Sequence, residues 1–554
     1  MLFLVFILLI HYYIFLTDMK RFLLLFLFAA LADITFAQTV PHTIRNQAVY
    51  DYLDEMAGMQ HIELNTVVKP YSRMFIAQKL HELERIREDL TPRQQRDLDF
   101  YLRDFGKELQ PGRPDNKRLD LFYRSDSLFK LTINPILGVQ VHTTDSASVL
   151  HRWNGVEAWA TLGKHLSAYA SLRDNFHSKR WMNEQLVSRA PGVNYKYNGD
   201  GGDFSEMKGG LYYSWDWGSL GAVKDDFAWG EGYAGTNIFS GRTPSFAHLS
   251  LHLKPVDWFE FHWVHGWLVS EVVDSTLSYT FTNSYGTTPR EVFYDKYLAA
   301  NLFTFQPIQH LYFSVGNSVI YSHVGPQLQF MLPVMFYKSV DHTYNATDSE
   351  GRNVGQNSQL FFSFSSKNIR RVHLYSTLFL DELAVSRWFK EDEYNFWSLK
   401  AGVRLYGLPA NTTFTAEYTK TMPLVYRHHI ATTTFRSNGY NLGSFMEDNV
   451  RQWYLSLTFY PARGLNAKVS YQHMEKGPDY TTMGVRRVGN PFLSEVRYTR
   501  QILALDLRYQ PWNDVFLTGS IGYEKNTGPD TRLYVPEYAM GGQMHMSVGV
   551  NVGF

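Results

Sequence analysis

The sequence contains no cysteine, and its 53 basic residues balance 53 acidic ones, so its net charge is zero. The absence of cysteine excludes disulfides, thiolate metal sites and a cysteine nucleophile. The balanced charge gives no electrostatic reason to expect nucleic acid as a partner. Beyond residue 40, no stretch reaches the roughly 20 apolar residues that a membrane-spanning helix needs. If the chain lies in a membrane, strands must therefore span it.

Aromatic residues, by contrast, are abundant. They make up 16% of the chain, although the mean hydropathy is only -0.27 and 19% of residues are charged. A helical membrane protein should be more apolar than this. A membrane β-barrel need not be, because its lipid-facing and lumen-facing residues alternate and aromatic girdles mark both membrane interfaces. The composition therefore favours a β-barrel.

The N-terminal residues have the pattern of an export signal. After Met19 come two basic residues, the apolar run Phe22–Leu31, and small residues at positions 35 and 37. These are the three parts of a secretory signal peptide. We therefore expect residues 1–37 to be a signal peptide that starts at Met19. The alternative is a tandem membrane anchor.

Helical spacing extends over residues 44–109. We expect three short amphipathic helices, the second capped by Ser72 and the third opened by a capping box of Thr91 and Gln94 around Pro92. Their apolar stripes include Ile76, Leu80, Leu83, Leu98, Tyr101 and Phe105. Residues 38–115 are therefore expected to form a small helical bundle in the periplasm.

From residue 116 onward the period of the sequence is two. In the last segment, apolar residues from Met544 to Phe554 alternate with polar or small ones. Eight short turns, near residues 163, 218, 256, 308, 367, 410, 462 and 512, alternate with longer polar segments. If each turn joins two strands and each end of the barrel adds one more, the pattern predicts an all-β transmembrane barrel of about 18 antiparallel strands over residues 116–554. The alternative is a soluble sandwich or propeller.

With the apolar parity outward, charges of both signs line the inner wall. The predicted lumen-lining residues are Lys400, Arg404, Glu417, Lys468, Asp506 and Arg508. A barrel of this size is wide enough to hold either water or a plug. We expect the helical bundle and the long loops to fill most of the lumen, and an open channel is the alternative.

Motifs for chemistry are lacking. The sequence shows no spaced His/Glu zinc motif, no nucleophile elbow and no phosphate loop. We therefore expect no catalytic residues, no metal and no cofactor. A barrel hydrolase with a serine and a histidine meeting at one rim remains the alternative.

Two loop segments, residues 175–209 and 225–242, combine aromatic rings with amides, carboxylates and glycine. Such surroundings suit sugar rings and their hydroxyls, although aromatic residues that pack loops or form a membrane girdle give the same pattern. The candidate glycan-binding residues are Trp181, Tyr195, Tyr197, Trp229, Glu231, Tyr233 and Arg242.

Several short motifs resemble those of a known family. They are Tyr50–Met56, Lys69–Arg73, Leu332–Val340, Asn353–Asn357 and Leu374–Glu382. Together with the order of the predicted parts, they resemble the Wzi-type capsule assembly family of outer-membrane barrels, including its divergent branch in gliding and gut Bacteroidetes.

The resemblance implies an outer-membrane barrel with a periplasmic helical bundle. Its implied role is to hold or organise capsular or exopolysaccharide at the cell surface in a lectin-like manner, without breaking bonds. Members of the Bacteroidetes branch are also associated with gliding and surface adhesion. The expected partners are surface polysaccharide, outer-membrane lipid and the barrel assembly machinery, and the protein is expected to be a monomer. A solute channel and a hydrolase are the alternatives.

Overall fold

The computed structural model describes residues 38–109, 120–284, 286–323, 325–344, 355–382, 395–481 and 490–554. The predicted signal peptide and the predicted boundary at residue 115 lie outside these residues. The chain from Gln38 to Phe554 forms one compact unit. None of the described helices is long and apolar enough to cross a membrane.

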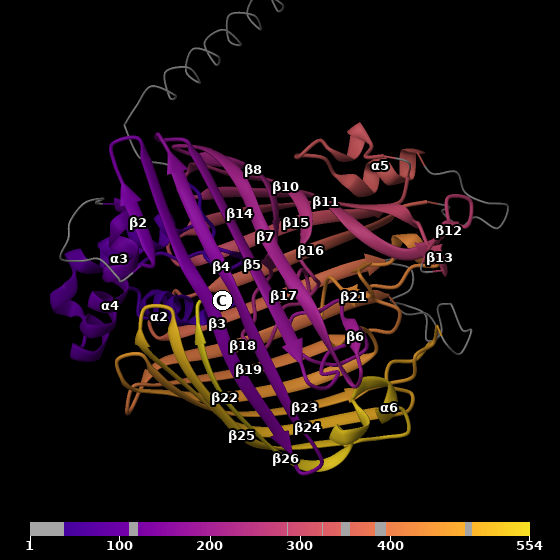
Figure 1. Ribbon diagram of the computed structural model, residues 1–554. Helices are drawn as coiled ribbons and strands as arrows, with labels where there is room; N and C mark the ends of the chain where they lie inside the picture. Colours follow the sequence, from indigo (N-terminus) through magenta and orange to yellow (C-terminus); the bar gives the residue numbers. More distant parts are fainter. Residues whose placement is uncertain are drawn as a thin grey trace, which may run out of the picture. The chain divides into compact units, whose positions relative to one another are not determined.

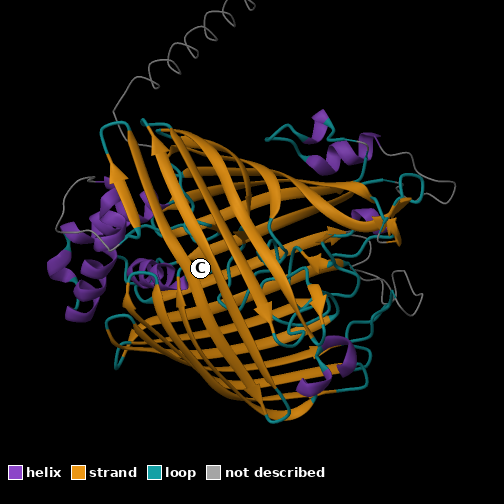
Figure 2. Cartoon of the chain, viewed as in Figure 1, coloured by secondary structure: helices purple, strands orange, loops and turns teal. Residues whose placement is uncertain are grey.

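The dominant feature is a closed barrel of 18 antiparallel strands, which confirms the predicted fold class (Figures 1 and 2). Its strands are β3 (Phe129–Thr144), β4 (Ser148–Leu162), β5 (Leu166–His177), β7 (Gly201–Trp215), β8 (Gly218–Asp225), β10 (Phe246–Val256), β11 (Phe259–Val273), β14 (Phe293–Ile308), β15 (Leu311–Tyr321), β16 (Asn357–Ser366), β17 (Val372–Glu382), β18 (Phe396–Leu408), β19 (Thr412–Thr421), β22 (Val450–Ala462), β23 (Leu465–Lys476), β24 (Tyr498–Trp512), β25 (Val515–Thr527) and β26 (Gly541–Val552). The last strand closes on the first, with Val548 opposite Val141.

Short strands and helices complete the fold. The strands are β1 (Val68–Lys69), β2 (Phe122–Ser125), β6 (Lys196–Asn198), β9 (Ala228–Trp229), β12 (Tyr279–Asn283), β13 (Gly286–Arg290), β20 (Arg436–Ser437) and β21 (Tyr440–Asn441), and the short helices are η1 (Arg87–Asp89), η3 (Leu328–Phe330), α5 (Tyr337–Tyr344), η5 (Ala431–Thr433), α6 (Thr531–Tyr534) and η6 (Glu537–Ala539). Among the described strands, β1 pairs with β9 and so joins the N-terminal segment to the rest of the chain.

Connections at the two ends of the barrel differ in length. The short turns between β4 and β5, β14 and β15, and β24 and β25 fall at residues 163–165, 309–310 and 513–514, as the sequence pattern predicts. Because the strands are antiparallel, every second connection lies at the same end. We call this end the turn end and the opposite one the loop end.

The side-chain period of two sorts residues between the outer face and the lumen. On the outer face, Val548 is 61% exposed and Leu503 is 55% exposed, whereas Lys400 on the inner wall is 1% exposed. The predicted parity of these strands is therefore the one observed.

One part of the outer face departs from this pattern. Asn301 and Asn317 point outward, but the segment at residues 325–344 covers them, and Asn301 donates hydrogen bonds to two of its carbonyl oxygens at 2.9 and 2.8 Å. The segment itself presents exposed Leu328, Leu332, Val334 and Phe336. It thereby satisfies buried amides and replaces a polar patch by an apolar one.

Three helices lie at the turn end: α2 (Gln47–Gly58), α3 (Arg73–Arg85) and α4 (Pro92–Leu109) (Figure 1). The predicted caps are present. Ser72 Oγ accepts a hydrogen bond from the backbone N–H of Phe75 at 3.1 Å, and Gln94 Oε1 accepts one from the N–H of Thr91 at 2.9 Å. The predicted apolar stripes form one buried cluster.

Candidate functional site

The first feature of the barrel interior is a carboxylate that joins helix α2 to the wall. Asp54 accepts hydrogen bonds from the hydroxyls of Tyr406 on β18, at 2.7 Å, and Tyr233, at 2.9 Å. Lys367 Nζ and Arg404 Nε each lie 3.6 Å from it. Burial raises the pKa of Asp54, but these two cations outweigh burial and hold the pKa well below its usual range. Asp54 therefore stays ionised and fixes α2 against the wall.

A second carboxylate holds residues 226–245, which we call the inward loop. Glu417 on β19 pairs with Lys400 at 3.1 Å and accepts hydrogen bonds from the Tyr375 hydroxyl, at 2.6 Å, and from the backbone N–H of Ala234, at 3.0 Å. Both charged side chains of the pair are almost completely buried. The loop is thus bound to the inner wall rather than projecting from the barrel.

The inward loop also pairs with the N-terminal segment through β1 and β9. Glu231 accepts a hydrogen bond from Thr66 Oγ1 at 2.7 Å, and burial raises the pKa of its carboxyl. Trp229, Glu231 and Arg242 are only 1%, 3% and 2% exposed. These three residues were predicted to lie on a glycan-facing loop, but they are buried, because their loop folds into the barrel and packs there.

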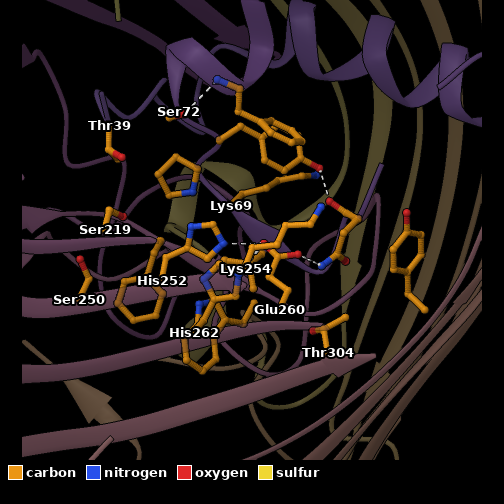
Figure 3. A pocket seen from close by; sticks show the side chains of 18 of the residues that line it. Thr39, Lys69, Ser72, Ser219, Ser250, His252, Lys254, Glu260, His262 and Thr304 are labelled. Carbon is orange, nitrogen blue, oxygen red and sulfur yellow. Dashed lines mark hydrogen bonds and ion pairs between the residues drawn. The ribbon is translucent and has the colours of Figure 1, made fainter. Parts of the chain in front are cut away.

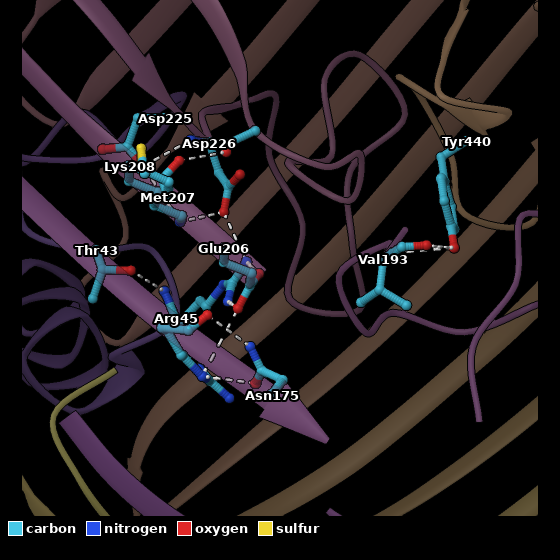
Figure 4. A network of polar contacts seen from close by, with 12 residues as sticks. Thr43, Arg45, Asn175, Val193, Glu206, Met207, Lys208, Asp225, Asp226 and Tyr440 are labelled. Atoms are coloured by element: carbon cyan, nitrogen blue, oxygen red, sulfur yellow. Dashed lines mark hydrogen bonds and ion pairs between the residues drawn. The ribbon is translucent and has the colours of Figure 1, made fainter. Parts of the chain in front are cut away.

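Further ion pairs connect the N-terminal segment to the wall (Figure 4). Arg45 forms a bidentate ion pair with Glu206 of β7, with hydrogen bonds of 2.6 and 2.8 Å. Its guanidinium also donates a hydrogen bond to Asp226 of the inward loop at 3.2 Å. Lys208 pairs with Asp226 from the next inward-facing position of β7. Paired charges thus bridge the helical segment, the inward loop and the wall.

Loops also cross the lumen near the loop end. Arg500 on β24 donates a hydrogen bond to the carbonyl oxygen of Val187, whose side chain packs in a buried cluster with Phe445. The Tyr440 hydroxyl donates to the carbonyl oxygen of Val193 at 2.9 Å (Figure 4). Side chains and loops of the described residues therefore occupy both ends of the lumen.

The structure places all six predicted lumen-lining residues on the inner wall. Lys400, Arg404 and Glu417 belong to the buried networks above. Lys468 and Asp506 pair with each other at 3.2 Å and remain partly exposed. Arg508 donates to Asp51 on α2 at 2.6 Å, so it too contributes to docking the helices.

The remaining candidate aromatic residues gather where the loops begin. We define the aromatic ledge as Trp181, Tyr195, Tyr197 and Tyr538. Trp181 stacks on His142 of β3 with 4.6 Å between ring centroids. The ring of Tyr538 also stacks on that of Trp181, with 6.5 Å between their centroids. Tyr197 is 65% exposed and its ring lies 6.2 Å from that of Tyr195.

Cationic side chains accompany these rings. Arg180 lies over Tyr197 at 5.2 Å, and Lys179 lies over Tyr538 at 5.8 Å. Flat rings beside cations can stack on sugar faces and pair with acidic substituents.

Tyr538 and His142 could not be found from the loop composition, because they come from chain segments remote from residue 181. Tyr233, the remaining candidate, lies inside the barrel beside Asp54.

A cavity of about 640 Å³ lies at the turn end, between the N-terminal segment and the wall (Figure 3). His252, Glu260 and His262 on β10 and β11 line it. These three residues were not among those predicted from the sequence. The available signal was the alternation of strand residues, which puts 260 and 262 on one face, and the hairpin register, which sets His252 opposite His262.

Comparisons with known proteins agree with this architecture. A sequence model described as capsule assembly protein Wzi matches residues 153–533. The structure resembles Escherichia coli Wzi, described as an outer-membrane protein involved in group 1 capsule assembly and a carbohydrate-binding β-barrel, with 13% identity, a TM-score of 0.55, and coverage of 94% of this chain and 100% of that one. The fold is therefore that of an outer-membrane β-barrel.

Other solved structures are less similar. Acinetobacter baumannii OccAB2 matches with 10% identity, a TM-score of 0.44, and coverage of 77% of this chain and 99% of that one. Pseudomonas aeruginosa OprD matches with 12% identity, a TM-score of 0.40, and coverage of 76% and 92%. No curated protein matches the chain. Since the sequence model spans well over half of the residues, the chain belongs to the Wzi family of capsule assembly proteins.

Proposed function

We propose that this protein binds and retains capsular or extracellular polysaccharide at the cell surface, as a lectin does, without breaking bonds. In this proposal the loop end faces outward, and the turn end with helices α2, α3 and α4 faces the periplasm. Family membership and the carbohydrate binding described for the Escherichia coli relative support it. Monomeric state and membership of the Bacteroidetes branch stay predictions.

The observation that carries the proposal is the filled lumen. The Asp54 and Glu417 networks, with the three buried ion-paired cations Lys367, Arg404 and Lys400, connect the helical segment, the inward loop and the wall. Opening a solute path would separate buried charges from their partners, at a cost of about 3–5 kcal/mol for each broken pair. This favours a binding surface over the alternative, a passive channel.

The aromatic ledge supplies the surface on which we place the ligand. Its exposed ring, that of Tyr197, offers a face for sugar stacking, and Lys179 and Arg180 offer positive charge next to the ledge. A polymer that carries carboxylates therefore fits this ledge better than a neutral one. Tyr195 fixes the backbone of the ledge at Trp181, because its hydroxyl accepts hydrogen bonds from the backbone N–H groups of Trp181, at 3.3 Å, and Met182, at 3.1 Å.

Binding of polysaccharide to the purified, detergent-solubilised protein tests this proposal. We expect calorimetry to detect binding of a uronate-containing polymer, and the change Trp181→Ala to weaken it at least tenfold. The matched control is Trp512→Ala, because Trp512 is 69% exposed but lies beside a short turn at the opposite end. Equal loss in both variants, or no binding to any polymer, would refute the proposed site.

A further inference from the structure

The cavity at the turn end is built from two parts of the chain. The wall contributes His252, Glu260 and His262 (Figure 3), and the segment before α3 contributes Glu63 and Asn65. Phe75, Lys79 and Glu82 of α3 also line it. Nothing in the proposed polysaccharide site, at the other end of the barrel, uses these groups.

Three of the lining side chains converge on one point. His252 Nε2 lies 2.8 Å and His262 Nε2 lies 3.1 Å from the same oxygen, Glu260 Oε1. The two imidazole rings are nearly parallel, 9° apart, with centroids separated by 4.4 Å. Strand geometry causes this convergence, since the two histidines are direct cross-strand partners and Glu260 is two residues from His262 on the same face.

The donor set and its spacing match a transition-metal site. All three potential ligand atoms lie within 4.8 Å of one another, and no other such group occurs among the described residues. In a tetrahedral zinc site with bonds of 2.0–2.1 Å, neighbouring ligand atoms are about 3.3 Å apart. The two observed nitrogen–oxygen separations are close to this value. After small side-chain shifts, an ion could therefore lie between the three ligand atoms, with the proton of each imidazole on Nδ1.

The surroundings resemble the support that bound metals receive. Asn65 Nδ2 donates a hydrogen bond to the second carboxylate oxygen, Glu260 Oε2, at 2.8 Å. Ligating carboxylates are commonly held in this way by a neighbouring donor. The side chain of His252 is 40% exposed, so the group is reachable from the cavity.

We propose that His252, Glu260 and His262 bind one Zn²⁺ ion. The two Nε2 atoms and the Glu260 carboxylate are its three protein ligands, and the fourth position faces the cavity, where water or a carboxylate of another molecule can occupy it. Two histidines and one glutamate with an open position form a ligand set that zinc accepts. Each neutral imidazole binds the ion through Nε2 with its proton on Nδ1, so occupation of the site requires this tautomer in both rings.

Metal titration of the full chain tests the proposal. The protein is purified in detergent without a histidine tag and stripped with a chelator, and Zn²⁺ binding is then measured against a chromophoric chelator. We expect one Zn²⁺ per chain, and loss of this site in both His252→Gln and His262→Gln. Asn65→Ala should weaken binding by about 10–100-fold, because Asn65 only orients Glu260. The matched control is His473→Gln, a histidine 3.5 Å from Glu475 without a second histidine partner, which should bind normally.

Folding of each variant is checked by its heat-modifiable migration in electrophoresis. If a histidine variant does not fold, Co²⁺ added to the wild-type protein decides the question, since a four-coordinate site gives intense visible absorption that one equivalent of Zn²⁺ should abolish. No stoichiometric Zn²⁺ binding by the wild type, absence of the Co²⁺ spectrum, or unchanged binding in the folded histidine variants would overturn the proposal.

Discussion

Helix α2 meets strand β18 through a pair of residues: the carboxylate of Asp54 and the hydroxyl of Tyr406 lie 2.7 Å apart. One turn further along α2, Gly58 lies against the ring of the same tyrosine, so closely that a Cβ atom at this position would overlap the ring. The helix can approach the wall this closely only because glycine has no side chain.

The change Gly58→Ala should therefore displace α2 from the wall and destabilise its docking by about 1–3 kcal/mol, as overpacking of buried contacts does. Limited proteolysis of the helical segment in the detergent-solubilised protein measures this. The control is Gly106→Ala in α4, where a Cβ would meet nothing within 4 Å. Since alanine favours helix by about 1 kcal/mol over glycine, the control should be as resistant as the wild type or more so. Equal resistance of both variants would contradict the docking described here.

The change Asp54→Asn removes the negative charge between Lys367 and Arg404. We expect it to lower the free energy of unfolding of the docked helices by about 3–5 kcal/mol, because two buried cations lose their partner. Asp89→Asn, at an exposed position outside the barrel contacts, is the control and should have little effect.

This effect has a defined pH dependence. Because the pKa of Asp54 is held below its usual value, its contribution is fully present above the unfolded pKa of about 3.9 and is lost as pH falls through the lower folded value. The difference in stability between wild type and Asp54→Asn should thus stay constant from about pH 5 to pH 8 and shrink below about pH 4. A difference that changes between pH 6 and 8 would show that another group is responsible.

Single-channel recording distinguishes a filled barrel from a channel. We expect the wild-type protein to be electrically silent in planar bilayers, because paired charges and loops cross its lumen. In Glu417→Ala, the inward loop loses the acceptor of two of its backbone N–H groups, and brief openings should appear. Steady conductance steps in the wild type would favour the channel alternative.

The outer face provides a test of strand register. The change Val548→Lys places a charge on the outer face and should reduce the folded fraction, since lysine near the bilayer midplane costs about 2–4 kcal/mol. Its neighbour Ser547 faces the lumen, so Ser547→Lys should be better tolerated, and the same contrast should hold between Leu505 and Asp506. Heat-modifiable migration reports the folded fraction, and equal tolerance at each pair would show that the register is wrong.

Local signals predicted most of the fold. Alternation fixes which side of β26 faces outward, and turn residues such as those near Asp514 end strands by their own backbone preferences. The caps at Ser72 and Thr91 are likewise formed within one helical turn. Each of these depends on residues close in the sequence, which explains why the helices, the turns and the number of strands could be predicted.

The interior of the barrel could not be predicted in this way. Trp229 and Glu231 lie in a glycine-rich, aromatic segment whose composition is the same for a surface loop as for one folded inward. Its burial depends on pairing with Val68 and on contact with Glu417, which are remote in sequence. The approach of His252 to His262 depends on the register of one hairpin, which is fixed by the geometry of its turn and not by the residue types of the two histidines.

The most direct test of the central claim compares cell-bound with released polysaccharide in a strain that lacks this protein, with total synthesis measured in parallel. If the protein retains polymer through its loop end, the strain should make normal amounts of polysaccharide but shed it, and the gene carrying Trp181→Ala should restore retention only in part. If cell-bound polymer is unchanged in the deletion strain, the protein does not anchor polysaccharide and the proposed function is wrong.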